Sequence, residues 1–156
     1  MINIEEIFNK NILIAVDESE NARRAVSYVG RLLAGIGGFK ILILHVIRQP
    51  DEDFFPTATE KDTWLSQHKL KVDAMLKNYR KILIKKGFAP ADVSVRSTLR
   101  YCPSLAECIL SERSQTKCHT IVVGRQGISR SEEFLFGSVS SKIVNHARNC
   151  TVWVVE

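Results

Sequence analysis

The stretch NILIAVDESENARRAV, residues Asn11 to Val26, decides the fold. Its first six residues form a nearly continuous apolar run, which is typical of a strand covered on both faces of a sheet. Ser19 can then cap a helix, and three glycines (Gly35, Gly37 and Gly38) predict its end. The apolar positions of this helix recur at 3.6-residue spacing: Ala22, Ala25, Val26, Val29, Leu32, Leu33 and Ile36. The stretch therefore predicts a buried strand followed by an amphipathic helix.

The same alternation continues to the end of the sequence. Four further strands are predicted: Lys40 to Ile47, Asp92 to Leu99, His119 to Gly124, and Thr151 to Val155. Three further helices are predicted: one from a Thr59–Asp62 capping box to Gly87, one from Pro103 in its first turn to Gln115, and one from Gly137-Ser138 to about Ala147. Alternation of this kind predicts a parallel sheet with helices on both faces and right-handed crossovers.

Length and composition limit the class of protein. The chain has 156 residues, is 45% hydrophobic and shows no internal repeat or linker, so we expect a single domain over residues 1–156. No apolar run is long enough to span a membrane, and the acidic N-terminus does not resemble a signal peptide, so we expect a cytoplasmic protein. The net charge of +5 favours anionic partners in general. Nucleic acid is not an expected partner, because no recognition module is present and the densest basic cluster lies on a periodic helix.

The four cysteines are expected to be reduced thiols that pack as small apolar groups. They are Cys102, Cys108, Cys118 and Cys150, and no C-x-x-C pair occurs among them. Their spacing does not predict a metal site.

The loop GRQGISRSEEFLFGSVSS, residues Gly124 to Ser141, is the main candidate for chemistry. Gly124 and Gly127 follow a predicted strand and lack Cβ atoms, so backbone amides there can approach an anion closely. Gly137 begins a helix whose unpaired amides and dipole favour phosphate, and nearby serines add hydroxyl groups. The alternative is a tight turn followed by an ordinary helix cap. The loop is neither a P-loop nor a dinucleotide fingerprint.

The whole pattern resembles the universal stress protein family, over Asn11 to Val155. The nucleotide-binding branch of that family is marked by Gly, two residues, Gly, nine residues, then Gly-Ser or Gly-Thr, and Gly124, Gly127 and Gly137-Ser138 match it. The segments ILIAVDESENARRAV and ILILHV are also similar to this family. The resemblance implies a three-layer α/β/α, Rossmann-like fold, with a five-stranded parallel sheet in the order 3-2-1-4-5, and ATP as the ligand.

The resemblance also implies roles for individual residues. Asp17 would accept hydrogen bonds from a sugar hydroxyl, although it can instead cap the first helix. Val46 would present its backbone to the adenine edge, although it can instead be only a core residue. The positions that would meet the phosphates are Gly124, Gly127, Gly137, Ser138, Val139 and Ser140.

Two features leave the pocket open to interpretation. Family members often have glycine where this chain has Arg100 and Tyr101. The larger side chains would narrow the pocket, or Arg100 would meet a phosphate. Arg125 and Arg130 are candidate phosphate contacts, and solvated arginines are the alternative.

The expected function is an ATP-binding regulatory module in a stress response, with Mg²⁺ bridging the phosphates and few or no protein ligands to the metal. The first alternative is a slow ATPase, but the motif places no lysine and no base, so at most weak hydrolysis is expected. The second is a dimeric interaction protein with a vestigial pocket. A homodimer through strand 151–155 is expected, because an apolar edge needs a partner. Trp153 would contact that partner, or would face the helices of its own chain.

Overall fold

Five parallel strands form one sheet in the computed structural model, which describes residues 8–125 and 137–156. The strands are β1 (Asn11–Ala15), β2 (Lys40–Arg48), β3 (Val93–Arg100), β4 (Thr120–Gly124) and β5 (Thr151–Val155). Their order across the sheet is β3-β2-β1-β4-β5, and every neighbouring pair is parallel. This confirms the predicted fold class and strand order.

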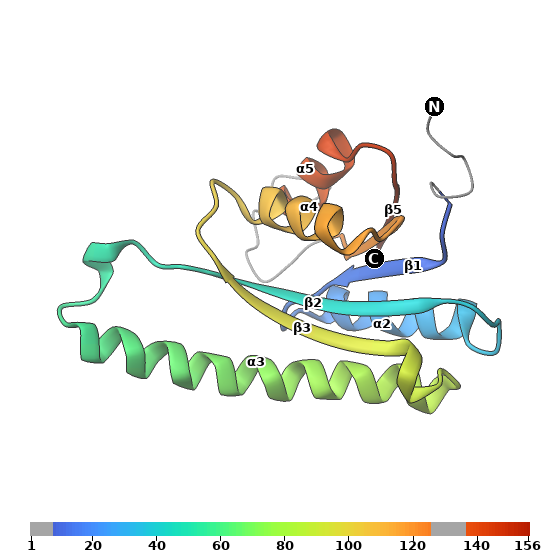
Figure 1. Cartoon of the computed structure of the whole chain (residues 1–156), viewed down its shortest axis with the longest axis horizontal. Helices are drawn as coiled ribbons and strands as arrows, with labels where there is room; N and C mark the ends of the chain where they lie inside the picture. Colours follow the sequence, from blue (N-terminus) through green and yellow to red (C-terminus); the bar gives the residue numbers. More distant parts are fainter. Residues whose placement is uncertain (1–7, 126–136) are drawn as a thin grey trace.

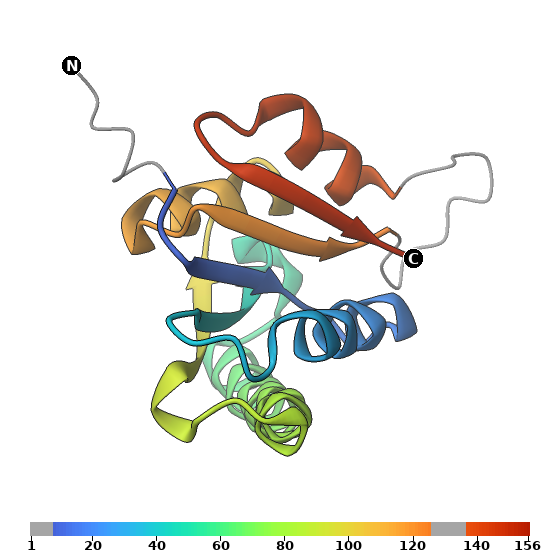
Figure 2. The same ribbon diagram turned by 90° about the vertical axis from the view of Figure 1, so that its right-hand side faces the viewer.

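In the described part of the chain, four α-helices cover the two faces of the sheet (Figure 1). They are α2 (Glu20–Leu33), α3 (Ala58–Lys86), α4 (Leu105–Thr116) and α5 (Ser138–His146), and short 3₁₀ turns occupy Glu52–Phe54 and Pro90–Asp92. Figure 2 shows α4 and α5 on one side of the strands and α2 and α3 on the other. The result is three layers, as the alternation of strands and helices predicts.

The central strand β1 has its two faces in two separate cores. Ile12 and Ile14 belong to the core under α2 and α3, and Leu13 and Ala15 belong to the core under α4 and α5. Leu13 and Ile14 are fully buried. Because successive side chains of a strand point to opposite faces, a strand that is covered on both sides needs an unbroken apolar run. This is the physical reason for the sequence NILIA.

Side-chain caps begin three of the helices, and two of the predicted starts were wrong. Ser19 caps α2 as predicted. The cap of α3 is Thr57, whose Oγ1 accepts a hydrogen bond from the Glu60 amide at 3.2 Å. The predicted cap, Thr59, lies inside the first turn, because the extended backbone of Thr57 lets the helix begin two residues earlier. Pro103 was predicted in the first turn of α4, but the helix begins at Leu105, and Ser104 caps it through the Glu107 amide, so Pro103 lies just before the cap.

The predicted apolar stripe of the first helix was wrong at two positions, because Leu32 lies within α2 but is 47% exposed and Ile36 lies beyond the helix. The helix α2 ends at Leu33, and Gly35 takes a left-handed backbone with φ of 85°. Glycine adopts this conformation without a Cβ penalty, so the chain turns away there. Ile36 therefore lies beyond the helix and is 52% exposed.

The prediction of four reduced cysteines was wrong for two of them. Cys102, in the β3–α4 connection, forms a disulfide with Cys108 on α4. The two positions are six residues apart, and the start of α4 at Leu105 brings their Cα atoms to 5.9 Å. Cys118 is a free, buried thiol, and burial raises its pKa. Cys150 is free and half-buried.

Candidate functional site

A cavity of about 180 Å³ lies where the carboxyl ends of β1 and β4 meet the start of α5. This position is the switch point of the sheet. After β1 the chain forms β2 and β3 on one side of that strand, and it then returns to form β4 and β5 on the other side. Most of the predicted site residues line this cavity: Asp17, Val46, Gly124, Arg125, Gly137, Ser138, Val139 and Ser140. Gly127 and Arg130 lie outside the described residues.

Asp17 lies two residues past the end of β1, at the cavity wall. Its Oδ1 accepts a hydrogen bond from the Ser19 amide at 2.8 Å, and the Ser19 Oγ accepts one from the Ala22 amide at 3.1 Å. Asp17 thus supports the start of α2 and also borders the cavity, so the two interpretations of this residue are compatible.

Val46 is both a core residue and part of the cavity wall. It is 6% exposed and belongs to the core under α4 and α5. It pairs in register with Thr98 of β3 and lines the cavity near the carboxyl end of β2. Its neighbour His45 was not predicted as a site residue, yet it lines the same cavity. The His45 Nδ1 lies 2.7 Å from the Val16 carbonyl oxygen, so that nitrogen must bear the hydrogen.

Close packing requires glycine at position 124, for a reason that the motif alone did not indicate. A Cβ atom at this position would lie 2.8 Å from the Asn21 carbonyl carbon, 2.9 Å from the Asn21 Cβ and 3.0 Å from the Ala22 amide nitrogen. The first turn of α2 therefore packs directly on the end of β4. The missing side chain allows two elements of the cavity wall to meet.

The start of α5 is open toward the cavity. Of α2, α3, α4 and α5, only α5 has no side-chain cap within the described part of the chain. Its N-cap is Gly137, whose amide donates to the Arg125 carbonyl at 2.8 Å. The amides of the first turn and the positive end of the helix dipole form a site that favours an anion.

The serine hydroxyls at this helix differ in their roles. Ser140 is 2% exposed, and its Oγ lies 2.7 Å from the Arg125 carbonyl oxygen and 3.1 Å from that of Gly137. A hydroxyl has a single hydrogen, and these two carbonyls compete for it, so this side chain fastens α5 to the end of β4. Ser138 is exposed and lines the cavity. A ligand can therefore reach the Ser138 hydroxyl, whereas the Ser140 hydroxyl is already engaged.

Arg125 links the cavity wall to the C-terminal strand. Its guanidinium lies 3.1 Å from a Glu156 carboxylate oxygen, and its amide donates to the Val155 carbonyl at 2.7 Å. Arg125 also lines the cavity, and its role as a phosphate contact stays a prediction.

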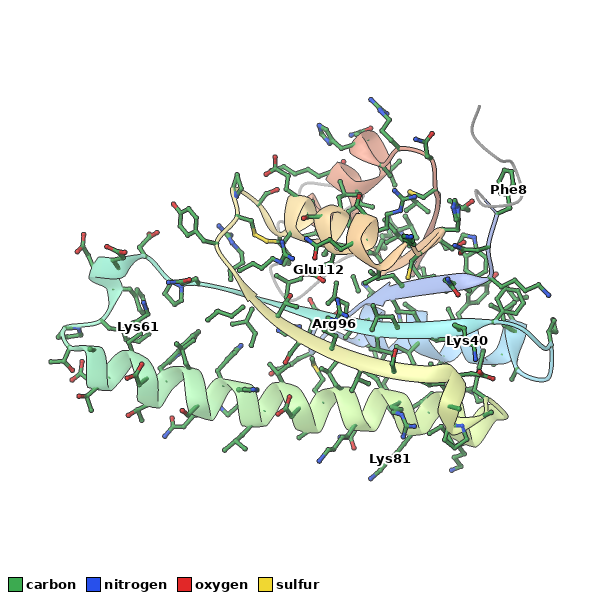
Figure 3. The ribbon with its side chains drawn as sticks, viewed as in Figure 1. Phe8, Lys40, Lys61, Lys81, Arg96 and Glu112 are labelled. Carbon is green, nitrogen blue, oxygen red and sulfur yellow. A yellow bond between two sulfur atoms is a disulfide. The ribbon has the colours of Figure 1, made fainter. Side chains whose placement is uncertain are left out.

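Arg100 and Tyr101 are not among the residues that line the cavity. The Arg100 Nε lies 2.6 Å from a carboxylate oxygen of Glu112 on α4, and Arg96 lies 3.2 Å from the other oxygen. Figure 3 shows Arg96 and Glu112 pointing toward each other between β3 and α4. Tyr101 is 81% exposed. Arg100 therefore forms an ion pair with α4, and Tyr101 faces solvent.

An apolar wall completes the cavity, and sequence reasoning missed part of it. Leu105 and Ile109 of α4 lie on this wall. The spacing of apolar residues in α4 predicts burial but does not indicate which buried residues face a cavity. The full apolar lining comes from strands and helices together: Ala15, Val16, Ala22, Leu44, Val46, Leu105, Ile109, Val123 and Val139. The cavity thus offers an apolar side and an anion-binding end.

A family model decides the relationship of this chain to known proteins. The model of the universal stress protein family matches residues 9–156. The chain belongs to the universal stress protein family. A universal stress protein of Staphylococcus aureus strain USA300 is 31% identical over 150 residues, which cover 94% of this chain and 83% of that protein.

Solved structures of other universal stress proteins have the same fold. The protein UspA from Lactobacillus plantarum has a TM-score of 0.73 at 20% identity, over 96% of this chain and 99% of that one. A universal stress protein in complex with cAMP has a TM-score of 0.69 at 20% identity, with 94% and 97% covered. One from Archaeoglobus fulgidus in complex with dAMP has a TM-score of 0.63 at 18% identity, with 96% and 99% covered.

Two further observations on the described residues bear on other kinds of site. Residues 8–125 and 137–156 contain no group of three or more His, Cys, Asp or Glu side chains that could hold a metal ion. No helix within the same residues is long and apolar enough to cross a membrane.

Proposed function

We propose that this universal stress protein binds an adenine nucleotide, ATP with Mg²⁺, and acts as a regulatory module in a stress response. The observation that supports the proposal best is the uncapped start of α5, which opens into an apolar-walled cavity bordered by Asp17. The cAMP and dAMP bound by two structural neighbours share an adenine base, which supports this class of ligand.

Each part of a nucleotide has a chemically matching part of the cavity. The base would lie on the apolar wall, beside the backbone of Val46. A ribose hydroxyl would donate to the carboxylate of Asp17. The phosphates would meet the first-turn amides of α5 and the Ser138 hydroxyl, where the helix dipole favours negative charge. Gly124 lets α2 approach closely enough to close the wall behind them.

Mg²⁺ would be held mainly by the phosphates and water. Magnesium commonly keeps several waters and uses few protein ligands at nucleotide sites. The proposal therefore needs no cluster of acidic residues. Because ATP is the proposed ligand, we also propose the cytoplasm as the place where the protein acts.

Bound nucleotide and thermal stability test the proposal together. Acid extraction of the purified protein should release an adenine nucleotide, and added Mg-ATP should raise the melting temperature. At 100 times the dissociation constant, a ligand stabilises the folded state by about 2.7 kcal/mol. AMP, ADP and ATP should bind with increasing affinity if the start of α5 holds phosphate.

A pair of glycine variants provides the matched control. The motif predicts that Gly127→Val weakens the response to ATP. Gly37→Val should retain that response, because Gly37 lies in the α2–β2 connection with nothing within 4 Å of an added Cβ. Absence of any shift at millimolar ATP, or an equal shift in Gly127→Val and the unaltered protein, would remove the proposal.

We also propose a homodimer through β5. This strand lies at one end of the sheet order, so one of its backbone edges has no neighbouring strand among the described residues. Trp153 is half-buried, and its ring packs edge to face on Tyr28 of α2 at a centroid distance of 6.3 Å. The dimer would therefore depend on the strand edge more than on the indole. Sedimentation at micromolar concentration that shows only monomer would contradict this proposal.

A further inference from the structure

We propose that Tyr79 of α3 is a positioning residue for the ribose subsite, because its hydroxyl fixes the peptide that bears Asp17. This inference rests on the proposed nucleotide function and deepens it. Tyr79 is not among the cavity-lining residues, so it would act on a ligand only through Asp17.

A short hydrogen bond joins two residues that are far apart in the sequence. The Tyr79 hydroxyl donates to the Asp17 carbonyl oxygen at 2.6 Å, across 62 positions. Tyr79 is 7% exposed, and its ring belongs to the core under α2 and α3. Because that core restrains the ring, the hydroxyl is held at a defined place beside the β1–α2 turn.

The β1–α2 turn needs such support because it lies just past the end of a strand. Strand β1 ends at Ala15, and the next two carbonyls each have a side-chain partner. His45 of β2 contacts the Val16 oxygen at 2.7 Å, and Tyr79 of α3 donates to the Asp17 oxygen. The Asp17 carboxylate in turn accepts a hydrogen bond from the Ser19 amide, with 2.8 Å between Oδ1 and the amide nitrogen. Two layers of the protein therefore hold the backbone that places this carboxylate at the cavity wall.

The Tyr79 hydroxyl remains a donor throughout the physiological pH range. Burial raises the pKa of Tyr79 to about 12, and the negative charge of Asp17 contributes in the same direction. A neutral phenol next to a carbonyl oxygen can only donate there. Its removal would leave the Asp17 carbonyl without this donor and the turn with more freedom.

The consequence for binding should be specific to the ribose hydroxyls. A misplaced Asp17 carboxylate loses its hydrogen bond to the sugar but leaves the apolar wall and the start of α5 unchanged. We expect Tyr79→Phe to bind ATP about 3- to 10-fold more weakly, the range typical of one hydrogen bond. The affinity for 2′,3′-dideoxy-ATP, which has no ribose hydroxyl to donate, should stay the same.

Calorimetric titration of the full chain with both nucleotides tests the inference. The matched control is Tyr28→Phe, which removes a phenol hydroxyl from α2 outside the cavity and should bind both nucleotides like the unaltered protein. Asp17→Ala should abolish the preference for ATP over dideoxy-ATP, and Tyr79→Phe should add no further loss in that background. Asp17→Ala also keeps the inference falsifiable if Tyr79→Phe does not fold.

The outcomes separate this inference from the proposed function. Equal weakening of both nucleotides by Tyr79→Phe would indicate a merely structural role and overturn the inference. Unchanged ATP affinity in Tyr79→Phe, or a preference for ATP that survives Asp17→Ala, would overturn it as well. If the unaltered protein binds both nucleotides equally well, the ribose role of Asp17 fails while nucleotide binding stands. If it binds neither, the proposed function itself fails.

Discussion

Replacing Gly124 by alanine should destabilise the protein, although the position lies at the end of a strand where alanine is normally tolerated. An added Cβ would approach three atoms of Asn21 and Ala22 at 2.8–3.0 Å. Two of these atoms belong to the backbone of the α2 start, and the third is the Asn21 Cβ. None is the flexible end of a side chain, so α2 itself must move away from β4.

The size of the effect follows from two opposing contributions. Overpacking that forces a backbone shift costs about 1–3 kcal/mol. The reduced freedom of alanine in the unfolded chain offsets about 0.4–1 kcal/mol of this cost. We therefore expect Gly124→Ala to lower the free energy of unfolding by about 1–2 kcal/mol. For a chain of this length, the corresponding fall in melting temperature is about 2–8 °C.

Urea denaturation followed by circular dichroism measures this change, and Gly37→Ala is its control. An added Cβ at Gly37 has nothing within 4 Å, and the backbone there does not have a positive φ. Gly37→Ala should therefore leave the free energy of unfolding unchanged or raise it by up to about 1 kcal/mol. If Gly124→Ala proves as stable as Gly37→Ala, the close packing of α2 on the end of β4 is refuted.

Three further predictions concern the cores and the crosslink. Cys102→Ser should lower the free energy of unfolding by about 2 kcal/mol in non-reducing buffer, because the disulfide restricts the unfolded chain; the difference should vanish with dithiothreitol, and a difference that persists would contradict the crosslink. Glu112→Gln should cost about 2 kcal/mol in urea denaturation, since Glu112 is 1% exposed and pairs with two arginines; an unchanged midpoint would show that the pairing does not stabilise the fold. The pKa of Tyr79 is raised from 10.0 to about 12, so its contribution is complete below pH 10 and lost as the pH rises to 12. Over that interval the unaltered protein should lose about 2–3 kcal/mol relative to Tyr79→Phe, and parallel stability curves would exclude the raised pKa.

The sequence alone determines the layers and the position of the site. The apolar run Ile12–Ala15 predicts a strand buried on both faces, and the alternation of strands and helices predicts a parallel sheet. Parallel strands place their carboxyl ends at one edge, so the order of the elements already predicts that Asp17, Val46 and Gly124 lie together. These predictions succeeded because they depend on local periodicity and on general rules of chain connection.

Helix boundaries were harder to predict because the sequence offers overlapping signals. Both Thr57 and Thr59 can begin a capping pattern, and both Pro103 and Ser104 can start a helix. The residue that becomes the cap is the one that keeps an extended backbone once the helix has packed, as Thr57 and Ser104 do. The consequence of having Arg100 and Tyr101 where family members often have glycine was likewise ambiguous from the sequence. The partner of Arg100 is Glu112, which lies on another element, α4.

Only the tertiary structure decided the interactions that join distant parts of the chain. The hydroxyl of Tyr79 meets the carbonyl of Asp17 across 62 positions, and the absent side chain of Gly124 admits the start of α2 from about a hundred positions away. No periodic pattern encodes such pairs, because each depends on the angle and distance at which two helices pack on the sheet. The sequence thus determined where the cavity would lie, and the packing of α2 and α3 on the sheet decided how the backbone of Asp17 is held at its wall.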